Sequence, residues 1–373
     1  MIKKKDIKRL LGELPLTAEV YWQLRQGGRP LSKNFSMRRT AKRLPDWIAQ
    51  ANQALQENSP AAGKGVLLFT TLRYWIEHAT LMSVALAGQG HQVTLAYLPY
   101  ANWHAPINRF DLRRNNAYAR SILLPAERLL NTVSFIDNRA PDKAFPSSIK
   151  AAIEQVSVRD VQYTQQIEEV DQNSELYLMR MKRNMQAAQT ALRWMRQNRP
   201  DLLITPNGSI LEMGAVYQVT RYLGIPIVTY EFGEQRDRIW LAQDAEVMGQ
   251  DTDDLWRAYQ NIPLSENQLE QIRALFASRQ RADLWENFSR RWQGIPSQGG
   301  AKVRQELDLD DRPVALLAAN VIGDSLTLGR CVFTRDMTEW LKRTVFEFAQ
   351  RSDAQLVVRI HPGERYTQGP SVA

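Results

Sequence analysis

The chain has few of the side chains that form disulfides or bind metal ions. Its 373 residues include one cysteine, Cys331, so one chain can form neither a disulfide nor a cysteine metal cluster. The four histidines, His78, His91, His104 and His361, do not follow any metal-ligand spacing. We therefore expect no bound metal, and the near absence of cysteine fits a reducing compartment.

Long apolar runs are absent as well. No stretch approaches the roughly 18 apolar residues that a membrane helix needs. The basic start of the chain, MIKKKDIKRLLGELPL, lacks the apolar stretch of a signal peptide because Glu13 and Pro15 interrupt it. Together these absences predict a soluble protein of the cytoplasm.

Positive charge is concentrated at the N-terminus. Residues 1–43 hold twelve lysines and arginines and three acidic residues, whereas the whole chain carries a net charge of only +8. Such a segment can contact anionic lipid headgroups at the inner face of the membrane, bind nucleic acid, or form a solvated face on helices packed against the first domain. Because the sequence contains no recognised nucleic-acid motif, we expect no nucleic-acid partner and keep the other two interpretations open.

Three segments of the chain follow a strand–loop–helix–strand pattern. Residues 65–98, 201–230 and 314–360 each begin with a short apolar run and continue with apolar residues at near-helical spacing. The stretch GIPSQGGA, rich in glycine, proline and serine, separates the last segment from the other two. We therefore predict an α/β fold with two Rossmann-like domains of parallel sheet that face a cleft, the second domain being incomplete.

This pattern also predicts where the domains begin and end. In chain order we expect a basic helical N-terminal segment, a first Rossmann-like domain, a linker and the start of a second Rossmann-like domain, at residues 1–55, 56–293, 294–301 and 302–373.

Polar residues follow the predicted strands, at the sheet edge where ligands of open α/β sheets bind. Asn207, Gly208 and Ser209 follow one strand and would present backbone amides at a helix start, which suits an anionic or hydroxyl-rich ligand. An ordinary N-cap turn would use the same residues. In the last segment, one strand is followed by Asn320, Gly323, Asp324 and Ser325, and the next ends in His361, with Arg359 and Arg365 close in sequence.

Two stretches resemble a known family. LVVRIHPGE, at the end of the last predicted strand, is similar to the His-Pro strand end of capsular-polysaccharide glycosyltransferases of the Kdo-transferase type. TPNGSILEMGAVYQVTRYLGIPIVTYE resembles the last strand–helix–strand unit of the acceptor domain of a GT-B glycosyltransferase. About seventy residues follow the linker, whereas the second domain of that family generally has well over one hundred. We therefore expect a C-terminally truncated second domain.

The resemblance implies a function. It implies transfer of a sugar from a nucleotide sugar to a glycan or lipid-linked acceptor in the synthesis of a surface polysaccharide, with no further cofactor. The nucleotide-sugar donor would contact six residues of the second domain, namely Asn320, Gly323, Asp324, Ser325, Arg359 and Arg365. The acceptor would contact Asn207, Gly208 and Ser209 of the first domain.

In this scheme His361 stabilises the leaving phosphate. If the reaction inverts, the first domain must supply a general base, for which Glu77, Glu212 and Glu231 are candidates because each lies at or just after a strand end. Two other interpretations stay open, namely a sugar-nucleotide epimerase of the same architecture and a non-catalytic remnant that acts as a binding or assembly subunit.

Overall fold

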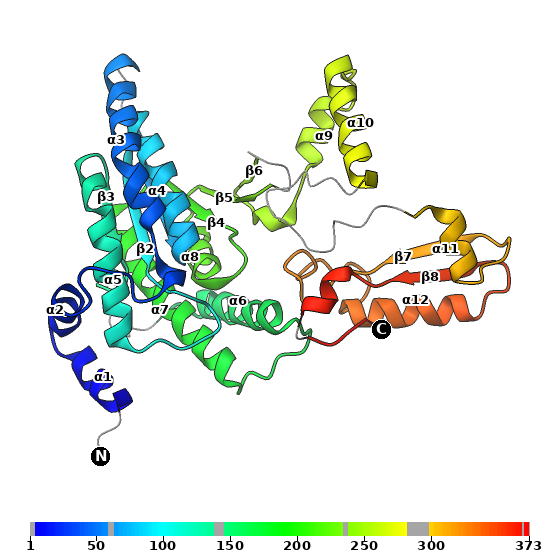
Figure 1. Ribbon diagram of the computed structural model, residues 1–373, viewed down its shortest axis with the longest axis horizontal. Coiled ribbons are helices and arrows are strands. Elements are labelled where there is room, and N and C mark those ends of the chain that lie inside the picture. Colours follow the sequence, from blue (N-terminus) through cyan, green and yellow to red (C-terminus); the bar gives the residue numbers. More distant parts are fainter. Residues whose placement is uncertain are drawn as a thin grey trace. The chain divides into compact units, whose positions relative to one another are not determined.

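The computed structural model describes residues 4–58, 63–137, 145–233, 238–281, 298–367 and 369–372. The chain is α/β, and its contacts divide it into two compact units (Figure 1). Unit 1 contains residues 1–160, 171–230 and 241–247, and unit 2 contains residues 161–170, 231–240 and 248–373. Most of the predicted linker lies outside the described residues, so that boundary stays a prediction; its last residues begin helix α11 (Gly300–Glu306).

A six-stranded sheet forms the centre of unit 1. Its strand order is β3-β2-β1-β4-β5-β6, which is the order of a Rossmann-like sheet. The first five strands are parallel, and hydrogen bonds from Asp244 to Ile227 and from Gly233 to Arg238 show that β6 runs antiparallel to β5. The strands are β1 (Gly65–Thr71), β2 (Gln92–Leu98), β3 (Asn131–Ser134), β4 (Leu202–Pro206), β5 (Ile227–Phe232) and β6 (Ile239–Gln243).

Helices pack around this sheet. The central strands are buried on both faces, as expected for parallel strands that read as continuous apolar runs. The helices that begin in unit 1 are α1 (Lys4–Glu13), α2 (Thr17–Leu24), η1 (Lys33–Phe35), α3 (Arg38–Asn58), α4 (Arg73–Gly88), α5 (Arg109–Leu123), η2 (Leu124–Arg128), α6 (Ser147–Gln165), α7 (Glu175–Asn198), α8 (Leu211–Tyr222) and η3 (Val247–Gly249).

The N-terminal helices α1 and α2 pack against α5. Their contact includes an ion pair between Lys8 and Asp111, 2.7 Å long, and a bidentate pair between Glu19 and Arg113. Helix α5 lies in a region where the apolar residues of the sequence follow no clear helical spacing. The reason is that its buried side includes Arg114 and Asn115, so a polar residue does not mark the solvent side of this helix.

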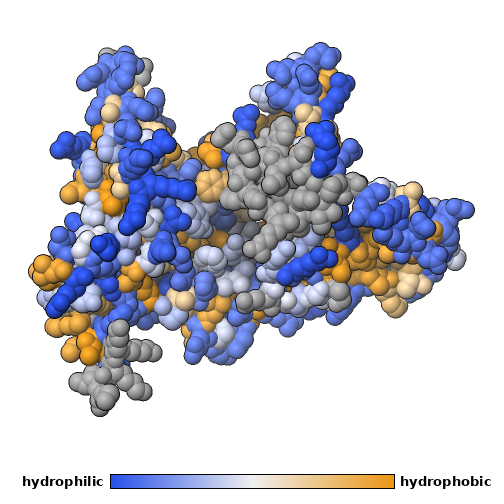
Figure 2. All heavy atoms as spheres, in the orientation of Figure 1, coloured by the Kyte–Doolittle hydropathy of each residue, from blue (hydrophilic) through white to orange (hydrophobic). Residues whose placement is uncertain are grey.

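Unit 2 contains a two-stranded parallel sheet of β7 (Val314–Ala318) and β8 (Gln355–Arg359). Helix α12 (Met337–Ala349) lies along this pair in Figure 1, and Leu317 of β7 and Leu341 of α12 form its small core. On the opposite face Leu316 remains 62 % exposed, and Figure 2 shows apolar surface in this region. The remaining helices of unit 2 include α9 (Asp253–Tyr259), α10 (Glu266–Arg281) and η5 (Pro362–Tyr366). Among the described residues, no helix has the length and apolar character to cross a membrane.

A buried ionic network joins three helices of unit 1. Arg180 of α7 is fully buried and donates to Asp160 of α6 and to Glu212 of α8, both at 3.0 Å, and to Asn184. Burial by itself would lower the pKa of Arg180, but the Glu212 and Asp160 carboxylates outweigh it and raise the pKa. Asp160 also accepts the Leu211 amide, the first of α8, at 2.6 Å. The network therefore fixes where α8 begins.

Replacing Arg180 with methionine should destabilise unit 1 strongly. The change leaves two carboxylates buried without their cation, a loss of about 3–5 kcal/mol. Urea unfolding measures it. The matched control is Arg196→Met on the exposed side of the same helix, which should change stability by less than about 0.5 kcal/mol. Similar unfolding curves for the two variants would contradict the role of the network.

Candidate functional site

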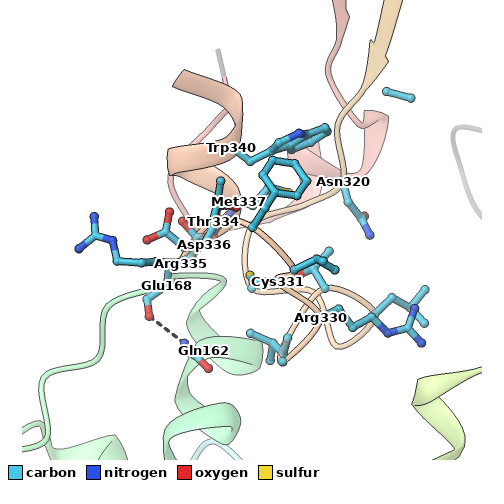
Figure 3. A pocket seen from close by; sticks show the side chains of 18 residues that line it. Gln162, Glu168, Asn320, Arg330, Cys331, Thr334, Arg335, Asp336, Met337 and Trp340 are labelled. Carbon is cyan, nitrogen blue, oxygen red and sulfur yellow. Dashed lines mark hydrogen bonds between the residues drawn. The ribbon is translucent and has the colours of Figure 1, made fainter. Parts of the chain in front are cut away.

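A cavity of about 370 Å³ lies in unit 2, beyond the carboxyl end of β7. Asn320 lines it from the end of that strand, and Met337 and Trp340 line it from α12 (Figure 3). The loop between β7 and α12 forms most of the wall and contributes Arg330 and Phe333. The cavity thus occupies the position at which open α/β sheets bind ligands.

The last turn of α6 and the segment that follows it close one side of this cavity. Gln162 and Glu168 line it there, and the Gln162 side chain donates to the Glu168 carbonyl at 2.7 Å (Figure 3). Gly323, with φ of 71°, lies against the same segment, where a Cβ atom would come within 2.6 Å of the Gln162 carbonyl oxygen. This position therefore requires glycine for two reasons, the positive φ and the close approach.

The amides at the start of α12 already have acceptors. The Glu168 carboxylate accepts the Met337 amide at 2.6 Å and the Thr338 amide at 3.2 Å, and it also accepts the Thr338 hydroxyl. Asp336 caps the helix by accepting the Glu339 amide at 2.7 Å. An anion bound at this helix start would have to displace Glu168, because both occupy the same donors.

The loop after β7 holds its polar residues by internal hydrogen bonds. Asn320 accepts the amide of Val321, and the Asp324 carboxylate accepts the amide of Leu326, both at 2.8 Å. Burial raises the pKa of Tyr163, and the Asp324 and Glu231 carboxylates raise it further. The structure therefore brings the predicted residues Asp324 and Glu231 to the same tyrosine.

His361 follows β8, which is the strand paired with β7. Its Nδ1 atom accepts the Gly363 amide at 3.0 Å, so the imidazole caps η5. The segment after His361 lies against the loop after β7, because a Cβ at Gly363 would be 3.4 Å from Val321. The two loops thus meet at one sheet edge, as predicted, whereas the predicted donor contacts Arg359 and Arg365 are exposed.

The predicted acceptor residues lie in unit 1, in a tight turn between β4 and α8. Asn207 has a left-handed backbone, and its side chain accepts the Ser209 amide at 3.0 Å. The Asn207 amide donates to Tyr230 and the Gly208 amide donates to Pro206. All three amides therefore have acceptors inside the protein, and the Asn207 and Ser209 side chains are buried.

The remaining predicted acids also lie in unit 1. Glu77 on α4 accepts from Arg73 at 2.8 Å and from Thr40 at 3.1 Å. Glu212 is 1 % exposed and belongs to the Arg180 network. Both carboxylates thus have a cationic partner that holds them.

Sequence reasoning did not identify Glu168, Arg330 or Trp340 as residues of this cavity. Glu168 lies about 170 positions before α12 in the chain, and no local pattern connects the two. Trp340 follows the apolar period of α12, so it reads as an ordinary core residue. Within the described residues, no group of three or more metal-binding side chains is placed to hold an ion.

No protein-family model matches the chain, and no curated protein matches it. Among solved structures, the chain is similar to the structure of a CDPS from Fluoribacter dumoffii at 12 % sequence identity. The match covers 48 % of this chain and 90 % of that one, with a TM-score of 0.30.

Replacing Glu168 with glutamine should loosen the start of α12. The amide side chain keeps the volume but loses the charge and one acceptor oxygen, and a lost helix cap costs about 0.5–2 kcal/mol. We expect faster hydrogen exchange at the Met337 and Thr338 amides by mass spectrometry. Glu169→Gln, at the exposed neighbouring position, is the control. Unchanged exchange in Glu168→Gln would show that the carboxylate does not hold the helix.

Proposed function

We propose that the chain belongs to a glycosyltransferase of GT-B type that transfers a sugar from a nucleotide sugar to a glycan or lipid-linked acceptor of a surface polysaccharide. The observation that carries this proposal is the cavity at the end of β7, beside the strand end that bears His361. A parallel strand–helix–strand unit with a cavity at its carboxyl edge suits a nucleotide.

The lining of the cavity fits the parts of a nucleotide. Trp340 and Phe333 offer aromatic surface to a base, and Asn320 offers an amide to its polar edge. Arg330 and Arg335 supply guanidinium groups for phosphate oxygens. Glu168 already accepts the first two amides of α12. In this proposal, therefore, the two arginines donate the hydrogen bonds to the phosphate oxygens.

His361 is the proposed donor to the leaving phosphate. Because its Nδ1 accepts the Gly363 amide, the neutral ring carries its proton on Nε2, which is the tautomer that donates a hydrogen bond from the outer nitrogen. The ring is held in place before any substrate binds, and this preorganisation is what makes such a donor effective.

Of the three candidate bases, the proposal favours Glu231. Glu212 is buried and paired with Arg180, and Glu77 is held by Arg73, so neither suits a base that must reach a substrate hydroxyl. Glu231 is half-buried at the end of β5, its carboxylate accepts the Phe232 amide at 3.0 Å, and it raises the pKa of Tyr163 together with Asp324 of the loop after β7.

Replacing His361 with alanine should lower the rate of sugar transfer about 100-fold, since a single preorganised donor contributes about that much. The assay follows the transfer of a labelled sugar from each of a panel of nucleotide sugars, and the product is identified. An epimerised sugar nucleotide as the product would indicate an epimerase in place of the proposed glycosyltransferase. His91→Ala is the control, since His91 also accepts a backbone amide at a turn. Wild-type rates in His361→Ala would refute the role of His361, and absence of any transferred sugar would refute the function.

We further propose that α1 and α2 contact an anionic membrane surface from the cytoplasm. Figure 2 shows apolar surface over these helices, and the exposed fractions of Leu10, Leu16 and Leu24 are 66 %, 68 % and 76 %. Exposed arginines accompany these leucines on the same helices and their connections. An exposed apolar face flanked by basic residues is the pattern of a helix that lies on an anionic bilayer.

The chain should sediment with vesicles that contain phosphatidylglycerol and much less with vesicles of phosphatidylcholine alone. Each basic residue near the surface contributes about 1 kcal/mol at most, so high salt should release the protein. The double variant Leu16→Ser, Leu24→Ser should weaken binding, whereas Leu255→Ser, at an exposed leucine of α9, should not. Equal binding to both vesicle types, or binding that resists salt, would overturn the proposal.

A further inference from the structure

A second cavity, of about 280 Å³, lies within unit 1. It is beyond the carboxyl ends of β2 and β3, where Leu98 and Phe135 form an apolar wall. Arg183, Gln186 and Thr190 line the opposite side from one face of α7, since they are three and four residues apart. None of these residues was singled out by the sequence, and the cavity shares no residue with the one in unit 2.

The charge of Arg183 is the unusual feature of this cavity. Its side chain is 6 % exposed and donates to the carbonyl oxygens of Asn102 and Ala105, at 3.1 and 2.8 Å. Its guanidinium lies 4.1 Å from the centre of the Tyr100 ring. These partners are neutral, and within the described part of the chain no carboxylate forms an ion pair with Arg183. By contrast Arg180, one turn earlier, has two.

The other charged residues of the cavity wall are already paired. Arg109 pairs with Glu13, Arg113 pairs with Glu19, and Asp137 lies 3.8 Å from Arg120 and also accepts from Asn116. Burial lowers the pKa of Arg183, and the attraction of Glu212 and Tyr100 does not offset it. A buried cation without a direct counter-ion is costly, and an anion in the cavity would remove that cost.

The polar groups beside Arg183 indicate more than a bare anion. Thr190 donates its hydroxyl hydrogen to the Gln186 carbonyl at 2.8 Å, so its oxygen can accept from a ligand. The Gln186 side chain supplies an amide on the same face of α7, three residues after Arg183. Such groups recognise hydroxyls, and the apolar wall suits the carbon skeleton of a small ligand.

We propose that this cavity binds a small hydroxylated organic anion, with its phosphate or carboxylate on Arg183 and its hydroxyls on Gln186 and Thr190. The proposal rests on unit 1 alone and does not depend on the glycosyltransferase function proposed for the chain. It makes this edge of the Rossmann-like sheet a ligand site distinct from the turn at Asn207.

Calorimetry on the full chain tests this site with glucose 6-phosphate, glucuronate and neutral glucose as probes, all at constant ionic strength. We expect one of the two anions to bind and glucose to bind much more weakly, and the better anion identifies phosphate or carboxylate as the recognised group. Absence of binding by both anions would overturn the proposal.

Variants then locate the binding. Arg183→Met should lower the affinity for the anion about 10-fold or more, because the protein loses the charge-assisted hydrogen bond from the buried guanidinium. Arg196→Met removes the same charge from the exposed side of α7 and should leave the affinity unchanged. Equal affinity in a folded Arg183→Met protein would place the anion elsewhere and overturn the proposal.

Arg183 also holds the backbone of Asn102 and Ala105, so its variant can lose the native fold. In that case the double variant Gln186→Leu, Thr190→Val decides, since it keeps Arg183 and alters only the cavity wall. We expect a several-fold loss of affinity for the sugar anion, and an unchanged affinity would overturn the proposal.

Discussion

The rest of unit 1 depends on the burial of one guanidinium group. Arg180 cannot leave water without anionic partners, and it finds them on two other helices, at Asp160 and Glu212. Asp160 in turn accepts the first amide of α8 at Leu211. A single cation thereby sets the spacing of α6, α7 and α8, and with it the turn that contains Asn207. Hydrophobic burial stabilises these helices, but the ionic network requires one particular arrangement of them.

Helix α6 and the segment after it supply carboxylates to helix starts in both units. Asp160 accepts the first amide of α8, and Glu168 accepts the first two amides of α12. In each case a side chain distant in sequence satisfies donors that a local cap would otherwise satisfy. The two helices that follow polar strand ends are therefore stabilised internally, and ligands at those strand ends must be bound by side chains.

The two cavities differ in the chemistry of their walls. The cavity of unit 2 combines Trp340 and Phe333 with exposed arginines, a lining that suits a planar base attached to phosphate. The cavity of unit 1 contains the buried Arg183 and two hydroxyl- or amide-bearing neighbours, a lining that suits a smaller anion. Both lie at carboxyl ends of parallel strands, where loops rather than the ladder determine which residues meet.

The sequence by itself predicted most strands of the parallel sheets, because short apolar runs such as Val66 to Phe69 favour strands and the helices between them show their apolar period. The run Val314 to Ala318 also forms a strand, but Leu317 is its one buried residue. It also placed Asn320 and His361 at neighbouring strand ends. It did not reveal α5, whose buried face includes Arg114 and Asn115, because a buried polar residue looks like a surface residue until its partner is known. Only the tertiary structure brought Arg180 to Asp160 and Glu212, Glu168 to α12, and Arg183 to a cavity. These contacts join residues far apart in the chain, and no local rule of propensity or spacing encodes them.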